Sequence, residues 1–204
     1  MRLYRPATVL VGVALVIVAG LIRLAEPDER LEDTTRYAVH GGVGEPMKGK
    51  DFILTVNRVK FARVVDPNPN DDDTRADADD RPIKTNGIFV TVEYQMEGRH
   101  ESGSAGDASL KADGGSVYVP INKAIRSQLN IPQPGFIESG SLVFEANPDD
   151  LVGLTLWAKK LRGLTTLTED YAIDLDIPDE SVAKDMIEHA EKLYPLTQPT
   201  LRAA

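Results

Sequence analysis

The 204-residue sequence contains no cysteine. Disulfide bonds and lipid attachment through a cysteine thiol are therefore both excluded, and an exported domain has only its hydrophobic core to stabilise it. A domain of about 150 residues buries about 68–70% of the surface that its unfolded chain exposes, which is enough without cross-links. With 42% hydrophobic residues the chain can bury a core, and at this length we expect one folded domain together with the anchor described below.

Histidine and basic side chains are also scarce. The three histidines, His40, His100 and His189, lie on separate predicted elements and form no pair at the short spacing of zinc sites. Beyond residue 25 the chain carries 20 basic against 32 acidic side chains, a formal charge of −12. Nucleic acids and anionic lipid surfaces both require a basic footprint, so we predict neither as a ligand.

Catalytic motifs are missing as well. Ser102, Ser104 and Ser141 have glycines nearby, but none lies in a Gly-x-Ser-x-Gly motif or at a predicted strand-to-helix turn. We therefore predict no enzyme, no cofactor and no catalytic residue. A hydrolase site assembled by the fold, with His40 or His100 near a serine and a carboxylate, is the alternative that the sequence leaves open.

One long hydrophobic run is present. Residues 6–22 include no charged side chain, and at 1.5 Å per residue they span about 25 Å as a helix, close to the ~30 Å hydrocarbon core of a bilayer. Arg5 and Arg23 can reach the headgroups from either end. We predict a transmembrane signal anchor over residues 1–23, with the N-terminus in the cytoplasm and the following domain outside it. A cleaved signal peptide is the alternative, although residues 18–20 form a poor cleavage site.

Beyond a polar juxtamembrane stalk at residues 24–34, the hydrophobic pattern changes to a period of two. This alternation is typical of strands with one face on a core. It marks four segments, residues 88–96, 142–144, 154–156 and 171–177. Turn sequences separate the segments and no strand–helix alternation occurs, which argues against a parallel α/β sheet. We predict an all-β, antiparallel β-sandwich over residues 35–178.

Three local features are predicted within this pattern. The alternation of residues 52–56 slips by one residue at Asn57-Arg58, as a β-bulge would cause. Asp113-Gly114 indicates a hairpin turn because both residues tolerate positive φ. Asn147-Pro148 indicates the N-cap and first residue of a short helical turn.

Residues 66–81 fall outside the β pattern. They contain seven aspartates, two prolines and no large apolar side chain, so we predict a disordered loop. Carboxylates at short spacing suit Ca²⁺, but this segment lacks the glycine and the closing glutamate of an EF-hand loop. The candidate calcium ligands are Asp71, Asp73, Asp77 and Asp79.

The period becomes helical after Pro178. Apolar residues then recur near one helical face, namely Val182, Met186, Ala190 and Leu193. We predict a short amphipathic helix over residues 179–194, followed by a tail at residues 195–204. The helix either docks on the sandwich or binds a partner.

Trp157 is the single tryptophan. It has the phase of Thr155 and Lys159, opposite to Leu154 and Leu156, so the alternation predicts it on the outer face of its strand. Tryptophan is enriched at interaction hot spots, which makes Trp157 the candidate partner-binding residue. The alternative is that a loop or the C-terminal helix covers it.

Three segments, residues 87–94, 109–114 and 141–146, carry a family resemblance. Their order and sequences resemble those of immunoglobulin-like extracellular domains of unknown function on bacterial lipoproteins and single-span membrane proteins, which are similar in fold to secreted immunoprotective antigens. The resemblance covers about residues 36–177. It implies an immunoglobulin-like fold and an extracytoplasmic location, but no catalytic residues. The Asp-rich segment and the C-terminal helix depart from the family's pattern.

These features predict a membrane-anchored, extracytoplasmic binding or scaffolding module of the cell envelope. We expect an accessory subunit of a membrane complex, whose partner is another envelope or membrane protein. The alternative is a calcium-responsive adhesion or sensor domain that uses the Asp-rich loop.

Overall fold

The structure is a computed structural model that describes residues 37–67, 81–100, 102–121, 128–159 and 169–204. All of these residues belong to one compact unit. The predicted anchor and stalk lie outside the described residues, as do residues 68–80 of the Asp-rich loop. None of the described helices is long and apolar enough to cross a membrane.

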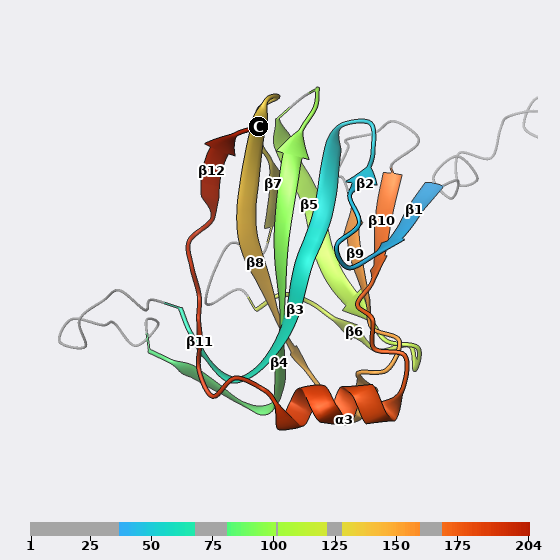
Figure 1. Ribbon diagram of the computed structural model, residues 1–204, viewed down its shortest axis with the longest axis vertical. Coiled ribbons are helices and arrows are strands. Elements are labelled where there is room, and N and C mark those ends of the chain that lie inside the picture. The colour runs from blue at the N-terminus through green and yellow to red at the C-terminus, as the bar shows by residue number, and fades with distance from the viewer. Residues whose placement is uncertain (1–36, 68–80, 101, 122–127, 160–168) are drawn as a thin grey trace, which may run out of the picture. The chain divides into compact units, whose positions relative to one another are not determined.

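The described chain forms two sheets of six strands each (Figure 1). The first, here the β5 sheet, has the order β1 (Tyr37–Gly42), β10 (Glu169–Asp174), β9 (Thr155–Lys159), β5 (Gly103–Lys111) and β6 (Val117–Tyr118), with β7 (Gln128–Ile131) also paired to β5. The second, here the β4 sheet, has the order β11 (Tyr194–Pro195), β3 (Phe52–Asp66), β4 (Ile83–Gly98), β8 (Phe136–Ala146) and β12 (Thr200–Ala203), with β2 (Met47–Lys48) also paired to β3. Pairing is antiparallel except between β1 and β10 and between β11 and β3. The predicted all-β sandwich is confirmed.

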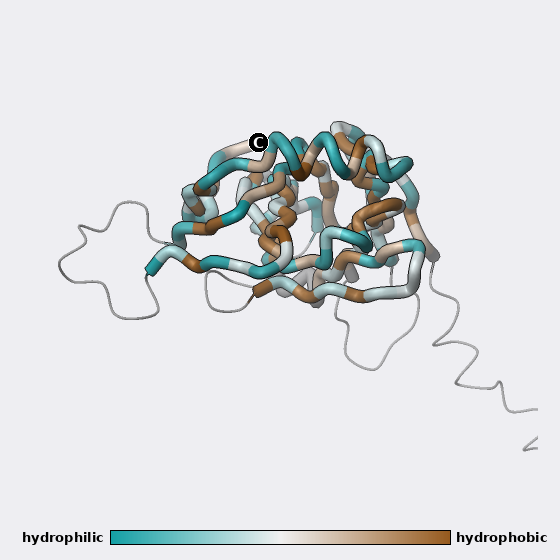
Figure 2. The backbone as a smooth tube through the Cα atoms, turned by 90° about the horizontal axis from the view of Figure 1, so that it is seen from below, coloured by the Kyte–Doolittle hydropathy of each residue, from teal (hydrophilic) through white to brown (hydrophobic). Residues whose placement is uncertain are grey.

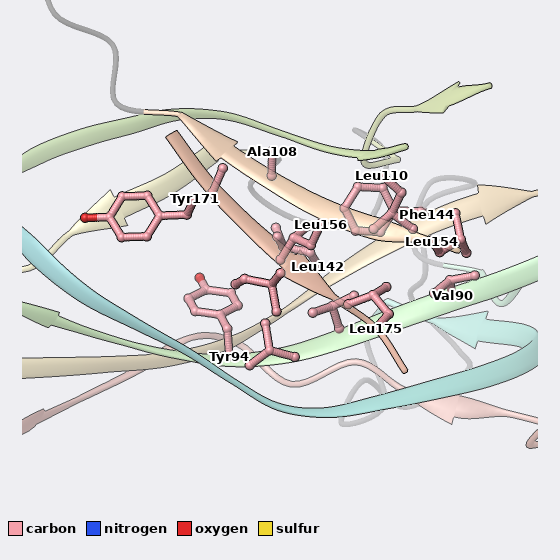
Figure 3. Packing of buried hydrophobic residues seen from close by; sticks show 14 of the residues in the cluster. Val90, Tyr94, Ala108, Leu110, Leu142, Phe144, Leu154, Leu156, Tyr171 and Leu175 are labelled. Carbon is pink, nitrogen blue, oxygen red and sulfur yellow. The ribbon is translucent and has the colours of Figure 1, made fainter. Parts of the chain in front are cut away.

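The two sheets enclose one main hydrophobic core. Val90, Val92 and Met96 on β4 are fully buried, as their period of two predicts. They belong to the same cluster as Leu110 and Leu156 of the β5 sheet, and Figure 3 shows these two leucines and Val90 pointing into the space between the sheets. The rings of Phe52 and Tyr171 stack across the core with their centroids 4.5 Å apart.

The three predicted local features are present. The register of β3 against β4 shifts between Val56 and Arg58, which is the expected bulge. The predicted hairpin joins β5 to β6, but its residue with positive φ is Gly115, at +89°, and not Asp113 or Gly114 as the sequence predicted. Asn147 caps the 3₁₀ helix η2 (Pro148–Asp150) through its side chain, which accepts a hydrogen bond from the Asp149 amide.

The C-terminal helix α3 (Glu180–Glu188) is docked on the sandwich. Its N-cap is Asp179, whose carboxylate accepts hydrogen bonds from the backbone amides of Ser181 and Val182. Ala183 is buried, and further apolar residues of α3 pack against the main core at the lower end of the unit in Figure 1. Figure 2 shows the matching alternation of hydrophobic and hydrophilic residues along the helix.

The chain after α3 differs from the predicted helix and tail. The helix ends at Glu188, because Glu191 exchanges backbone hydrogen bonds with β3: its N–H donates to the Phe61 carbonyl and its carbonyl accepts from Arg63. Residues 195–204 are not a tail but supply β12, which pairs with β8. We call residues 191–203 the C-terminal strap, since they run from β3 to β8 along the β4 sheet (Figure 1).

A second hydrophobic cluster explains why the strap stays in place. The outer face of the β4 sheet is apolar where the strap crosses it. The buried residues of the sheet in this cluster are Ala62, Val65, Phe89 and Val143, and those of the strap are Tyr194 and Leu196. Exposure of these side chains to water would be unfavourable by roughly 25 cal/mol per Å². The strap is thus the third layer of this part of the sandwich.

Candidate functional site

A groove of about 300 Å³ lies on the outer face of the β4 sheet, beside the strap. Residues of β3, β4 and β8 form one wall of the groove, and residues of the strap form the other wall. Its lining residues are Asn57, Lys60, Glu93, Tyr94, Ser139, Gly140, Ser141, Tyr194, Pro195, Thr197, Gln198 and Thr200.

Glu93 is the centre of the polar network in this groove. Its carboxylate accepts a hydrogen bond from the Tyr194 phenol at 3.2 Å and from Arg58 Nε at 3.1 Å, and Lys60 Nζ lies 3.6 Å away. Because the phenol has one proton and donates it to Glu93, the Ser141 hydroxyl, 3.1 Å from the phenol oxygen, is the donor in that pair. The network therefore fixes the strap to β3, β4 and β8 together.

Two ionisable side chains in the groove have pKa values raised above their usual range, Lys60 and Tyr194. The hydrogen bond from Lys60 to Glu191, at 2.9 Å, raises the pKa of the lysine above its usual value. Burial raises the pKa of the Tyr194 phenol. At neutral pH Lys60 is thus charged and Tyr194 is neutral, so neither can take a proton from Ser141. A nucleophilic serine needs an adjacent base, and these two neighbours do not provide one.

Backbone geometry directs the remaining polar side chains to the groove. Asn57 is the extra residue of the β3 bulge, which places it at the groove's rim. Ser139 and Ser141 flank Gly140 on β8, so both have the outward phase. A Cβ atom on Gly140 would lie 2.8 Å from the buried Tyr94 hydroxyl, which explains the glycine between the two serines.

Trp157 does not belong to this groove. It lies on the outer face of the β5 sheet, in register with Ser109 and Ala172, and its neighbours in sequence, Leu156 and Ala158, are fully buried. Its side chain is half-buried, and Lys111 Nζ lies 3.9 Å from the centroid of its ring. The predicted outward phase is confirmed, whereas a role in partner binding stays a prediction.

The other candidate residues either lie outside the described residues or do not line the groove. Asp71, Asp73, Asp77 and Asp79 lie outside the described residues. The exposed histidines, His40 on β1, His100 after β4 and His189 after α3, do not line the groove. Within the described part of the chain, no group of three or more acidic or histidine side chains is arranged to hold a metal ion.

The sequence offered only an indirect signal for the groove. The alternation places Glu93 on a solvated outer face of its strand, and Tyr194-Pro195 predicts the end of a helix. However, Phe89 and Val143 are apolar at positions that the same alternation assigns to the outer face of the sheet. That mismatch indicates that another segment covers the face, and the strap is that segment.

No protein-family model matches the chain, and no curated protein matches it. Among solved structures, the chain is similar to the yjhA protein from Bacillus subtilis, with 16% identity and a TM-score of 0.46 over 67% of this chain and 99% of that one. It is also similar to an uncharacterised β-sandwich protein from Clostridium difficile 630, with 10% identity and a TM-score of 0.36 over 68% of this chain and 94% of that one.

Proposed function

We propose that the chain is a non-enzymatic binding module, an immunoglobulin-like sandwich tethered to the membrane and presented outside the cytoplasm. The uncharged hydrophobic run at residues 6–22 supports the tether. The two-sheet architecture supports the immunoglobulin-like class, and so does the family resemblance carried by residues 87–94, 109–114 and 141–146. The module acts as an accessory subunit of a membrane complex in the cell envelope.

The groove beside the strap is the observation that carries this proposal. Its walls are strands of one sheet and a strap fixed at both ends, by β11 to β3 and by β12 to β8. Side chains held on such rigid elements lose little freedom when a ligand binds, and this preorganisation favours affinity.

A photocrosslinking experiment tests the proposal in native membranes. A photoreactive amino acid replaces Gln198 of the full-length chain, on the groove wall, or Gln133, an exposed glutamine outside the groove. We expect irradiation to attach a membrane or envelope component at position 198 and not at position 133. Equal products at both positions, or none at position 198, would contradict the proposal.

A further inference from the structure

We infer that the ligand of the groove is a neutral glycan, bound through hydroxyl and amide side chains of β3, β8 and the strap. This inference rests on the proposed function, since it names the ligand of the same groove. It follows from three features: the charges, the unused polar side chains and the position of the groove on the sheet.

The charges of the groove are already matched within the protein. Lys60 contacts both Glu191, at 2.9 Å, and Glu93, at 3.6 Å, and Arg58 contacts Glu93 at 3.1 Å. An anionic ligand would have to compete with Glu93 and Glu191 for these cations, and a cationic ligand would have to displace them. A neutral ligand leaves every ion pair intact.

Polar side chains around the ion pairs are free to bind. The hydroxyl and amide side chains of the lining that form no hydrogen bond to another described residue are Asn57, Ser139, Thr197, Gln198 and Thr200. Each of these groups can donate as well as accept a hydrogen bond. The hydroxyl groups of a sugar have the same double capacity, so a polyhydroxylated ligand can satisfy several of them at once.

The position of the groove argues against a peptide. An extended peptide commonly adds to a free sheet edge, through its backbone. This groove lies on the face of the β4 sheet, and at Ser139 the strand β8 is paired to β12. The exposed large hydrophobic residues of the described chain, such as Val119 and Leu201, lie outside the lining. Its volume is at the lower end of the ~300–1,000 Å³ of small-molecule sites, which suits a short segment of a glycan.

Calorimetry on the full-length protein tests this inference, in a detergent without a sugar headgroup. The probes are three neutral hexasaccharides (cellohexaose, maltohexaose and N-acetylchitohexaose) and hexagalacturonate as the anionic comparison. We expect saturable binding of at least one neutral probe and none of the anionic one. Ser139→Ala combined with Gln198→Ala should weaken binding at least tenfold, whereas Gln133→Ala, at an exposed glutamine outside the groove, should leave it unchanged.

Two results would overturn the inference. One is the absence of heat for all three neutral probes at millimolar concentration, and the other is binding that the double variant leaves unchanged. If no saccharide binds while a protein is crosslinked at position 198, the proposed function stands and the glycan assignment falls. If position 198 yields no crosslink and no saccharide binds, both fall.

Discussion

Tyr194 joins the groove to the buried part of the strap. Its ring is 5% exposed and packs in the second hydrophobic cluster, while its hydroxyl donates to Glu93 and accepts from Ser141. A phenylalanine would keep the packing and remove both hydrogen bonds. Ser141, which is buried, would then lose its acceptor.

We expect Tyr194→Phe to lower the free energy of unfolding by about 1–3 kcal/mol, the usual cost of leaving a buried polar group without a partner. Urea denaturation measures the change. Tyr118→Phe is the matched control, because the Tyr118 phenol donates a hydrogen bond to Asp150 from a half-buried position. Removal of that hydrogen bond should lower the free energy of unfolding by less. Equal effects of the two substitutions would show that the Tyr194 network contributes nothing specific.

His189 gives the described chain a pH-dependent contact at the end of α3. Its Nδ1 lies 2.8 Å from the Asp185 carbonyl oxygen, and this hydrogen bond, with the Asp185 carboxylate at 3.2 Å, raises the pKa of the imidazole above 6.5. Because the pKa is higher in the folded state than in the unfolded state, the stabilisation is complete below about pH 6.5. It is lost as the pH rises through the folded-state pKa.

We expect an NMR titration of His189 to give a pKa above 6.5 and Asp185→Asn to lower it. The substitution removes the carboxylate charge but keeps the backbone carbonyl, so the pKa should fall only part of the way. An unchanged titration in Asp185→Asn would show that the carboxylate has no influence on the imidazole.

At the scale of elements, the strap depends on one leucine. Leu196 is 2% exposed in the second cluster, whereas Leu201, five residues further along the same strap, is 60% exposed. Full burial of a leucine contributes about 1.5–3 kcal/mol, and a charge at the buried position adds a desolvation penalty.

We therefore expect Leu196→Asp to destabilise the protein by at least about 2 kcal/mol and to release the strap. Hydrogen exchange should then become faster in β12 than in β4. Leu201→Asp, the control on the same strap, should stay within about 0.5 kcal/mol of the original protein. If Leu196→Asp leaves exchange in β12 unchanged, the second cluster does not hold the strap.

Features encoded by neighbouring residues were predictable from the sequence. The β4 alternation, the bulge after Val56, the hairpin before β6 and the Asn147 cap each depend on a few adjacent positions. The strap and the groove were not predictable in this way. The strap rests on pairing between residues far apart, such as Ala62 with Glu191, and no local period encodes which strand a distant segment joins.

At the scale of the whole described unit, the two outer faces differ. The β4 sheet has the strap and the groove on its outer face, whereas the outer face of the β5 sheet carries Trp157. The described chain begins at β1, an edge strand of the β5 sheet. The first described strand therefore belongs to the sheet opposite to the one that carries the groove.

Placement of the groove outside the cytoplasm is tested most directly by cysteine labelling. The chain has no native cysteine, so Gln198→Cys introduces a single thiol at an exposed position of the groove. Protoplasts that carry the full-length variant are treated with a membrane-impermeant maleimide before and after lysis. We expect the same labelling in both samples. Labelling that occurs only after lysis would contradict the extracytoplasmic location and the envelope function proposed with it.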